Sequence, residues 1–291
     1  MTTTHTQRWR DRRDSYRPAG EPIDVTRYGV ALLDEAPARD FVVQHHYSAS
    51  YPAARCRVGM YRAGGELVGV AVFSVPMNQR AIPKYTGQLA NAGVELGRFV
   101  LLDDVPANGE TWFLARAFDL LRVAKPGVKA VLSYSDPVPR KTLAGDVVTP
   151  GHVGTIYQAH NATHVGRSAS RTQLLDAAGR VISPRMLSKL RNDEQGAAYA
   201  YQSLRDRGAP PRLALESGRD YVARVSAAGS FRKERHPGNL AYAWGLDKRA
   251  KRQLPAGLRY PKACEEITGH YMPVEDLEEI EDLTAFAQLA A

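Results

Sequence analysis

Residues 94–136 read VELGRFVLLDDVPANGETWFLARAFDLLRVAKPGVKAVLSYSD, and this stretch decides the fold class. It begins and ends with apolar, β-branched runs that are typical of buried strands. The apolar residues between these runs keep one face of a helix: Phe113, Leu114, Ala117, Phe118 and Leu121. A helix that connects two strands is the usual parallel crossover. We therefore expect an α/β protein with a mixed central sheet and flanking helices.

Gly97 interrupts the first of these strands. A glycine inside a strand often marks a bulge or the close approach of another backbone. Glu95 and Arg98 are three residues apart, so they lie on opposite faces of the strand unless Gly97 introduces a bulge. An arginine in an apolar strand is costly to bury without a partner. Arg98 is therefore an edge residue, a member of a structural ion pair, or a group that orients an anionic or carbonyl substrate.

The neighbouring segments extend this layout. A helix is predicted over 38–46, and residues 56–74 predict a β-hairpin with a glycine-rich turn. A loop that contains Pro76 and Pro83 is expected next. After the crossover, residues 152–166 (HVGTIYQAHNATHVG) predict a short helix and then a strand.

Composition limits the classes of protein that are possible. Hydrophobic residues make up 44% of the 291 residues and charged residues 24%, which is typical of a folded domain and not of a disordered chain. No apolar run approaches the roughly 18 residues of a membrane-spanning helix, and the N-terminus lacks the apolar segment of a signal peptide. Cys56 and Cys264 form no CxxC pair, so a reducing cytoplasm is expected.

Charge is distributed in blocks. Residues 1–17 hold five Arg against two Asp, and residues 232–262 hold nine Lys/Arg against two acidic residues. Residues 263–291 hold eight Asp/Glu and no Lys/Arg. Basic blocks favour a polyanionic partner, because each Lys or Arg near a phosphate releases condensed counterions. The alternative is that these blocks are only solvated surface.

Three regions are expected along the chain. Residues 1–22 are predicted to be a flexible basic arm, and residues 23–168 to be the α/β core. Residues 169–291 are predicted to be a basic C-terminal extension that contacts nucleic acid, wraps on the core and ends in the acidic tail. The part of the extension after residue 215 is expected to be irregular, basic and aromatic.

His45, His46 and Tyr47 close the first predicted helix. Adjacent histidines on a helix cannot both face one ligand, so at most one is expected to point inward. A surface histidine pair beside a packed tyrosine is the alternative. A metal site would need further ligands brought in by folding, and the sequence contains no HExxH motif.

Polar residues follow the second strand of the crossover. Tyr134 and Asp136 end it, and ligands of open α/β sheets collect at the carboxyl ends of strands. Asp136 could accept a proton or hold an amine there, or it could simply cap the loop. Tyr157 and Gln158 lie on the short helix, where the phenol could act as a general acid, stack on a planar base, or belong to the core.

Taken together, these segments resemble the GNAT acetyltransferase superfamily and, within it, the Mom family of phage DNA-modification proteins. The residues that carry the match are HHY at 45–47, GGELVGVAVFSVPMNQR at 64–80, ELGRFVLLDDVPANGETWFLARAFDLL at 95–121, SYSD at 133–136 and HVGTIYQA at 152–159. Their order and spacing over roughly residues 28–168 make the match specific. The resemblance implies a GNAT-like core with a basic C-terminal extension.

The resemblance also implies a function. Mom proteins convert the N6 amine of adenine in phage DNA to its carbamoylmethyl form, which protects phage DNA from restriction in the host cytoplasm. By this match Arg98, Asp136, Tyr157 and Tyr47 are expected to be catalytic, and His46 is a candidate iron ligand. The residues expected to bind substrate are Asn78, Glu95, Tyr134 and Gln158. The donor of the carbamoylmethyl group is not identified by the sequence.

The chain departs from the wider superfamily at the turn before its central helix. The pyrophosphate of coenzyme A is usually held there by a glycine-rich turn, whereas this chain has DDVPANGE at 103–110. Asp103, Asp104 and Glu110 would repel a pyrophosphate that the helix N-terminus otherwise attracts. This departure puts acetyl-CoA in doubt as the donor.

Double-stranded DNA is the expected partner, and no membrane is expected. Tyr242, Trp244 and Tyr260 are interleaved with basic residues, as in surfaces that bind nucleic acid, although the aromatic residues could instead be core. The residues predicted to contact DNA are Arg140, Lys141, Arg232, Lys233, Arg235, Lys248, Arg249, Lys251 and Arg252.

Two other functions stay open at this point. One is a GNAT N-acetyltransferase that acts on a protein or a small amine with acetyl-CoA. The other is a non-catalytic DNA-binding protein on a GNAT scaffold, which predicts DNA affinity without any altered adenine.

Overall fold

The computed structural model of the chain describes residues 5–10, 13–18, 22–46, 48, 50–149, 151–227 and 229–262. Within the predicted N-terminal arm, β1 (His5–Arg10) and β2 (Arg13–Pro18) pair as an antiparallel hairpin. The predicted catalytic residue Tyr47 and the acidic tail, residues 263–291, lie outside the described residues.

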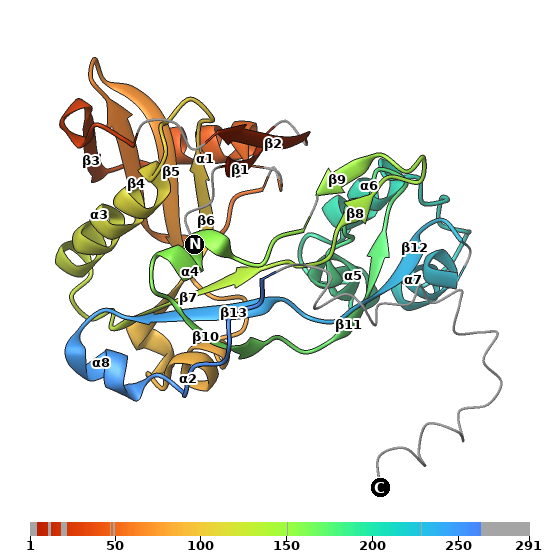
Figure 1. Ribbon diagram of the computed structural model, residues 1–291. Coiled ribbons are helices and arrows are strands. Elements are labelled where there is room, and N and C mark those ends of the chain that lie inside the picture. Colours follow the sequence, from red (N-terminus) through yellow and green to blue (C-terminus); the bar gives the residue numbers. More distant parts are fainter. Residues whose placement is uncertain are drawn as a thin grey trace, which may run out of the picture. The chain divides into compact units, whose positions relative to one another are not determined.

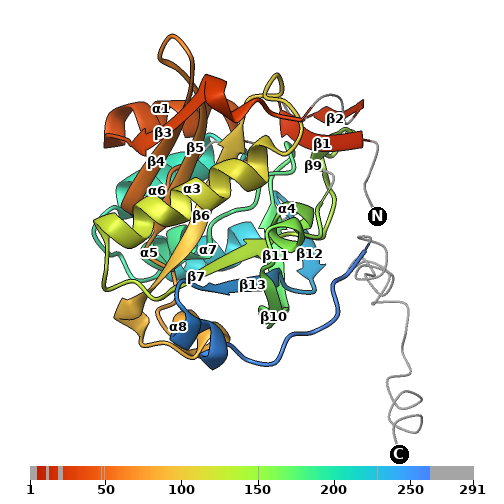
Figure 2. The ribbon, with the colours of Figure 1, turned by 60° about the vertical axis from the view of Figure 1, so that its left-hand side comes forward.

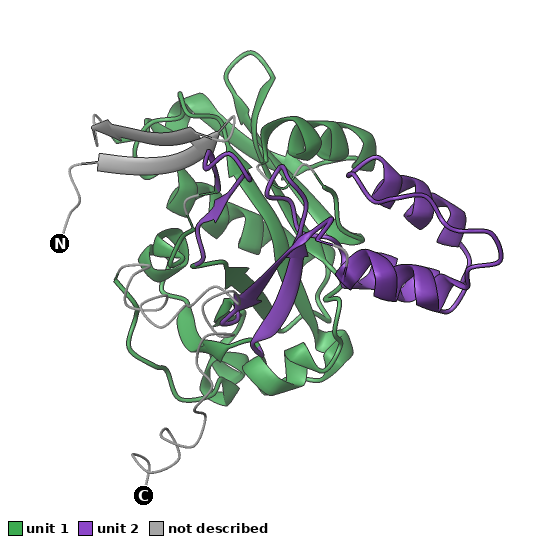
Figure 3. Cartoon of the chain, turned by 90° about the vertical axis from the view of Figure 1, so that its right-hand side faces the viewer, with its two compact units in different colours: residues 1–137, 149–168, 239–266 green, residues 138–148, 169–238, 267–291 purple. Residues whose placement is uncertain are grey.

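The chain forms two compact units, which are coloured separately in Figure 3. Unit 1 comprises residues 1–137, 149–168 and 239–266, and unit 2 comprises residues 138–148, 169–238 and 267–291. The chain passes from unit 1 into unit 2 at residue 168, where the extension was predicted to begin, and it returns to unit 1 after residue 238.

Unit 1 is built on a seven-stranded sheet with the strand order β10-β13-β7-β6-β5-β4-β3 (Figure 1). The pair β6 and β7 is parallel, and every other neighbouring pair is antiparallel. The strands are β3 (Tyr28–Leu32), β4 (Ala54–Arg62), β5 (Glu66–Ser74), β6 (Gly93–Leu101), β7 (Ala130–Ser135), β10 (Thr163–Arg167) and β13 (Leu240–Gly245). The predicted mixed α/β sheet is therefore confirmed.

The helices of unit 1 flank this sheet. They are α1 (Glu35–His45), α2 (Ala81–Thr86), α3 (Gly109–Ala124), α4 (Thr155–Ala159) and α8 (Lys248–Gln253), with short 3-10 turns at Val25–Arg27 and Ala90–Ala92. The helix α3 connects β6 to β7, so the predicted parallel crossover is confirmed. The predicted hairpin is also confirmed, as β4 and β5.

Two layers of side chains cover the sheet, because successive residues of a strand point to opposite faces. On one face Phe99 of β6 stacks on Phe113 of α3, with ring centroids 5.4 Å apart. On the other face Val72 and Val100 pack in a buried cluster with Phe41 of α1. Figure 2 shows α3 running across the strands on its side of the sheet.

The predicted loop around Pro76 and Pro83 was wrong in part, because α2 occupies its second half. Pro83 lies in the first turn of α2, where a helix needs no backbone N–H donor from that residue. The amide of Ala81 donates to the carbonyl of Asn78 at 2.9 Å, which starts the helix.

The expectation of irregular structure after residue 215 was also wrong. This region contains a helix, two strands and another helix, and β13 lies in the middle of the sheet between β10 and β7. Leu240, Tyr242 and Trp244 are buried, and so are Ala241 and Ala243 between them. A central strand that is covered on both faces has no polar alternation, so its sequence did not show the usual strand pattern.

Unit 2 has an apolar cluster of its own. Leu187, Leu190, Leu204, Tyr221 and Val225 belong to it. Its helices are α5 (Pro184–Arg191), α6 (Ala197–Arg205) and α7 (Gly218–Ala227), and its strands are β8 (Arg140–Lys141), most of β9 (Val147–Thr149), β11 (Arg171–Leu175) and β12 (Arg232–His236). β11 pairs antiparallel with β12, and β8 pairs with β9 in a second two-stranded sheet. Among the described residues of the chain, no helix is long and apolar enough to cross a membrane.

Candidate functional site

The candidate site lies where β6 and β7 separate. The parallel ladder between them covers three pairs, from Gly93 with Ala130 to Glu95 with Leu132. Both strands continue beyond this ladder, to Leu101 and Ser135. The carboxyl end of β7 is thus released from β6, which is where an α/β sheet offers a place for a ligand.

A bulge at Gly97 shapes this edge. On β5, Val72 pairs with Arg98 and the next residue, Phe73, pairs with Leu96, so Gly97 is the extra residue. A Cβ atom on Gly97 would collide with the Ser74 hydroxyl, so the position has no room for a side chain. The bulge changes the side-chain alternation, and Arg98 therefore points to the same face of the sheet as Glu95. Of the alternatives that the sequence left open for Gly97, the structure therefore has the bulge.

Arg98 is held by the segment that follows α1. Its Nε donates to the Ser50 carbonyl at 2.9 Å, and its Nη2 donates to the Ser50 hydroxyl at 2.7 Å. Two contacts from one guanidinium fix its plane. The side chain is half-buried.

His46 lies beside this arginine at the end of α1. Burial, together with the positive charges of Arg98 and His152, lowers the pKa of His46 to about 3. The ring is therefore neutral at neutral pH. The Ser48 amide donates to His46 Nδ1 at 3.1 Å, which places the proton of the neutral ring on Nε2.

His152 connects the arginine side of the site to the carboxylate side. Its backbone amide donates to the Asp136 carbonyl at 2.7 Å. Burial lowers the pKa of His152, and the Asp136 carboxylate acts in the opposite direction. The imidazole of His152 and the phenol ring of Tyr157 lie edge to face, with centroids 6.5 Å apart.

Tyr157 of α4 is anchored by aromatic neighbours. Its ring centroid is 5.6 Å from that of Tyr242 and 5.6 Å from that of Trp244, both on β13. The hydroxyl of Tyr242 donates to the carbonyl of Val153, just before α4. Tyr157 itself is half-buried, so part of its ring stays accessible.

Three of the four predicted catalytic residues therefore gather around two histidines. Arg98 and His152 both influence His46 electrostatically, the Asp136 carboxylate does so at His152, and the rings of His152 and Tyr157 lie edge to face. His152 was not among the predicted site residues, although it begins the stretch HVGTIYQA at 152–159. Its place at the start of that stretch was the available signal.

The four residues predicted to bind substrate fall into different surroundings. Burial raises the pKa of Glu95 to about 6, against the opposing effect of Arg98. Burial and the neighbouring Glu95 carboxylate raise the pKa of Tyr134. Glu95 and Tyr134 thus form the wall next to Arg98, with Tyr85 at 6.1 Å from Tyr134 by ring centroids.

Gln158 and Asn78 have structural contacts. The amide nitrogen of Gln158 donates to the carbonyls of Val153 and Pro261, at 2.9 and 3.0 Å, and lies 3.1 Å from the Tyr242 hydroxyl. These contacts connect α4 to β13 and to the segment after α8. Asn78 is exposed, and its side chain accepts from the Arg80 amide at 3.0 Å. Their roles in substrate binding stay predictions.

The described residues do not provide the donor set of an iron site. No three His, Cys, Asp or Glu side chains gather within the described part of the chain in a way that could hold a metal ion. The Nδ1 of His46 is already engaged by Ser48. No chemical step is therefore assigned to a metal.

In the turn before α3, an acidic side chain forms an ion pair with a basic side chain of the same protein. Asp104 pairs with the Arg62 guanidinium at 2.6 Å, and Arg62 also pairs with Glu66 at 3.0 Å. The backbone at Asn108, which precedes α3, is left-handed. These features are consistent with the expectation that this turn does not hold a pyrophosphate.

The predicted DNA-binding residues divide between the two units. In unit 1, Lys248, Arg249, Lys251 and Arg252 are all exposed on α8, on either side of the buried Ala250. The others belong to unit 2, where Lys141, Lys233 and Arg235 are exposed and Arg140 and Arg232 are half-buried. The predicted nucleic-acid role of Tyr242 and Trp244 was wrong as a surface role, because both are core residues.

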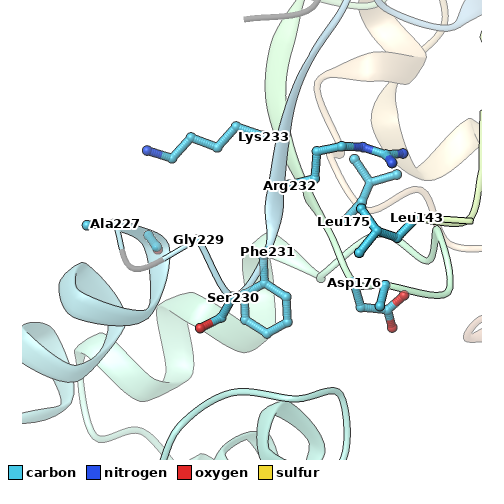
Figure 4. A pocket seen from close by; sticks show the side chains of 11 residues that line it. Leu143, Leu175, Asp176, Ala227, Gly229, Ser230, Phe231, Arg232 and Lys233 are labelled. Carbon is cyan, nitrogen blue, oxygen red and sulfur yellow. The ribbon is translucent and has the colours of Figure 1, made fainter. Parts of the chain in front are cut away.

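A pocket in unit 2 lies beside the end of α7, where β11 ends and β12 begins (Figure 4). Its volume is about 360 Å³, and Asp176, Phe231 and Arg232 are among its lining residues. The Asp176 carboxylate is almost fully buried and pairs with Arg180 at 2.8 Å. In Figure 4 the side chains of Arg232 and Lys233 extend to opposite sides of β12. None of the predicted catalytic residues lines this pocket.

Comparisons with known proteins match residues 27–212 to the family described as the Mom protein family. The match covers more than half of the chain. The chain is also similar to the protein named methylcarbamoylase mom of Escherichia phage Mu, with 28% identity over 141 residues. That alignment covers 48% of this chain and 54% of the relative, so the chain spans about half of the relative's length.

Solved structures with a partly similar fold include a tandem GNAT protein from the clavulanic acid biosynthesis pathway, with a TM-score of 0.40 and 10% identity. That alignment covers 76% of this chain and 99% of the other. A spermidine N-acetyltransferase from Vibrio cholerae has a TM-score of 0.31 and 10% identity, and the alignment covers 50% of this chain and 85% of the other.

Proposed function

The chain belongs to the Mom protein family, and from this premise we propose that it modifies DNA by converting the N6 amine of adenine to an N6-carbamoylmethyl amine. The observation that carries the proposal is the gathering of Arg98, Asp136 and Tyr157 around His46 and His152, at the edge where β6 and β7 separate. A guanidinium, a carboxylate and a partly accessible phenol in one place fit a reaction at a planar base.

The base has to leave the duplex before it can react. Adenine N6 is recessed in the major groove, and enzymes that act on such atoms extrude the nucleotide at a cost of roughly a few kcal/mol. Tyr157 is the residue proposed to stack on the extruded purine, and its ring contacts with Tyr242 and Trp244, which hold it in place, support this role.

Asp136 is the group proposed to act on the amine. It accepts a hydrogen bond from N6 and takes a proton from it as the new bond forms. A new bond joins N6 to the methylene carbon of a carbamoylmethyl donor, and the bond from that carbon to the donor's leaving group breaks. The neighbouring His152 is buried and its pKa is lowered, so a neutral imidazole lies beside the carboxylate at neutral pH.

Arg98 is proposed to orient the donor. Two of its hydrogen bonds go to Ser50, so the guanidinium is held in one plane. A carboxamide oxygen of the donor is an acceptor that this group can bind. The DNA around the reacting base would be held by the exposed cations of α8 and of unit 2 through its phosphates.

The test is to express the full chain in a bacterium, digest the DNA to nucleosides and measure their masses. The expected result is a deoxyadenosine species heavier by one carbamoylmethyl group, absent from cells with an empty vector. DNA affinity with unaltered nucleosides would favour a non-catalytic DNA-binding protein. Unaltered nucleosides together with calorimetric binding of acetyl-CoA would favour an acetyltransferase of other amines.

A further inference from the structure

A leucine in unit 2 has an unusual backbone conformation. Among the described residues, those other than glycine with positive φ are Asn108, Asn161, Asp193 and Leu215. Asparagine and aspartate tolerate this left-handed region, but a bulky residue such as leucine is an outlier there. Leu215 has a φ of 63° and its side chain is fully exposed. Strain of this kind persists only where the surrounding structure enforces it.

Hydrogen bonds enforce the conformation of residues 211–217, which we term the leucine loop. The Glu216 carboxylate accepts from the Leu213 amide at 3.0 Å and from Arg224 through two nitrogens, at 2.7 and 2.8 Å. Arg224 lowers the pKa of Glu216 to about 2, so this carboxylate stays charged. Arg212 closes the loop by donating to the Glu216 carbonyl at 2.8 Å.

The base of the leucine loop is fixed to the core of unit 2. The Arg224 guanidinium also donates to the Pro211 carbonyl at 2.8 Å, and the Tyr221 hydroxyl donates to the Pro210 carbonyl at 3.0 Å. Tyr221 is fully buried in the apolar cluster of the unit. The exposed Leu213 and Leu215 are therefore held out by a rigid support and cannot fold back onto the protein without breaking it.

The charge of unit 2 indicates what the leucines meet. Residues 138–148 and 169–238 hold fifteen Lys/Arg against eight Asp/Glu, so this part of the chain is strongly basic. A stable protein–protein interface buries about 800 Å² of accessible surface on each partner. Two leucine side chains on a narrow loop do not supply that area. Apolar wedges in DNA-bending proteins consist of one or two such side chains set among cations.

We propose that the leucine loop inserts Leu215, supported by Leu213, between neighbouring base pairs of duplex DNA. This inference rests on the proposed function, since it takes DNA as the substrate. A wedge between base pairs weakens stacking and lowers the cost of extruding a base, which is the step that the proposed reaction requires.

The experiment uses the purified full chain and a duplex that contains 2-aminopurine, whose emission rises when the base unstacks. Leu215→Asn removes the apolar wedge and introduces a residue that accepts left-handed backbone, so the fold is retained. We expect wild type to raise the emission and Leu215→Asn to raise it much less. Affinity for the duplex should fall about ten- to a hundredfold, as for one leucine that is no longer buried.

Leu32→Asn is the matched control, because Leu32 is an exposed leucine at the end of β3 with ordinary extended backbone. It should leave emission and affinity unchanged. The inference is overturned if Leu215→Asn behaves as wild type does, or if wild type binds the duplex without raising the emission. The two proposals can fail separately. If the wild-type protein unstacks DNA but the nucleosides of cells that express it are unaltered, the proposed function is contradicted and the insertion of Leu215 is not.

Discussion

The two buried histidines of the candidate site are expected to stay neutral while the reaction proceeds. Burial opposes their protonation, and Arg98 adds to this effect at His46. Neutral imidazoles add no positive charge to the surroundings of Asp136. The chemistry of the site therefore depends on burial as much as on the identity of the reacting groups.

His46 makes the stability of unit 1 sensitive to acid. Its pKa is about 3 in the folded protein and 6.5 in an unperturbed histidine, so below pH 6.5 the unfolded state binds more protons and the stability falls as the pH falls. Between pH 7.5 and pH 5 we expect wild type to lose about 2 kcal/mol through this group, and His46→Gln to be spared that loss. Urea unfolding followed by tryptophan fluorescence measures this, because Trp112 and Trp244 lie in unit 1.

Glu95→Gln is the control, because Glu95 changes the stability with pH in the opposite direction to His46. The pKa of Glu95 is raised to about 6, so the folded state binds more protons than the unfolded state between about pH 4.5 and pH 6. Its contribution is present at low pH and is lost as the pH rises through 6. Lowering the pH from 7.5 to 5 should therefore stabilise wild type through this group, whereas Glu95→Gln, which mimics the neutral acid at every pH, should lack that gain. Equal pH dependence in wild type and His46→Gln would show that His46 is not buried as described.

At the scale of single elements, the bulge in β6 decides which side chains meet. If Gly97 were an ordinary paired strand residue and not the extra residue of a bulge, Arg98 would point toward α3 and away from Glu95. The short ladder between β6 and β7 then opens the place where Asp136 and His152 approach. One residue thus sets the arrangement of the whole site.

Gly97→Ala tests the bulge. The added Cβ would collide with the Ser74 hydroxyl and lie 3.3 Å from Pro52 Cγ, so we expect a loss of about 1–3 kcal/mol, as for overpacked cores. Thermal unfolding measures the loss, and Ser74→Gly in the same chain should restore part of it. Gly127→Ala is the control, since a Cβ there meets nothing within 4 Å. A Gly97→Ala protein as stable as the control would contradict the close approach.

The sequence was sufficient to predict the helices and strands whose apolar residues recur with a clear period. The hairpin of β4 and β5 and the crossover through α3 were predicted, because each has a local signature, and a bulge at Gly97 was one of the alternatives left open. β13 was not, since a strand buried on both faces shows no alternation. The place of His152 beside Asp136 could not be predicted either, because it depends on how β7 and the chain before α4 meet in space.

At the scale of the whole molecule, charge is expected to govern association with DNA. The exposed cations of α8 in unit 1 and of unit 2 are each expected to contact phosphates, which carry affinity without sequence information. The affinity should therefore fall steeply with salt, while the chemistry depends only on the site in unit 1.

Charge reversal on α8 tests this. Lys248→Glu with Arg252→Glu changes two exposed cations one turn apart on the helix. We expect weaker duplex binding and a salt slope that flattens by about 0.9 for each lost phosphate contact. Arg39→Glu with Arg116→Glu is the matched control, because both arginines are exposed and pair with acidic residues of their own helices. Fluorescence anisotropy over a salt series gives the slope, and identical slopes in the two variants would exclude α8 as a contact.

The most direct measurement is the yield of modified adenine nucleoside in DNA from cells that express Asp136→Asn, with wild type and Asp119→Asn beside it. Asp119 is an exposed aspartate on α3 that pairs with Arg122 at 2.7 Å. If the carboxylate at the end of β7 takes the proton from the amine, Asp136→Asn should lower the yield about 10²–10⁴-fold. Its affinity for duplex DNA should stay at the wild-type value, and Asp119→Asn should retain the full yield. An undiminished yield from Asp136→Asn would contradict the assignment of the site.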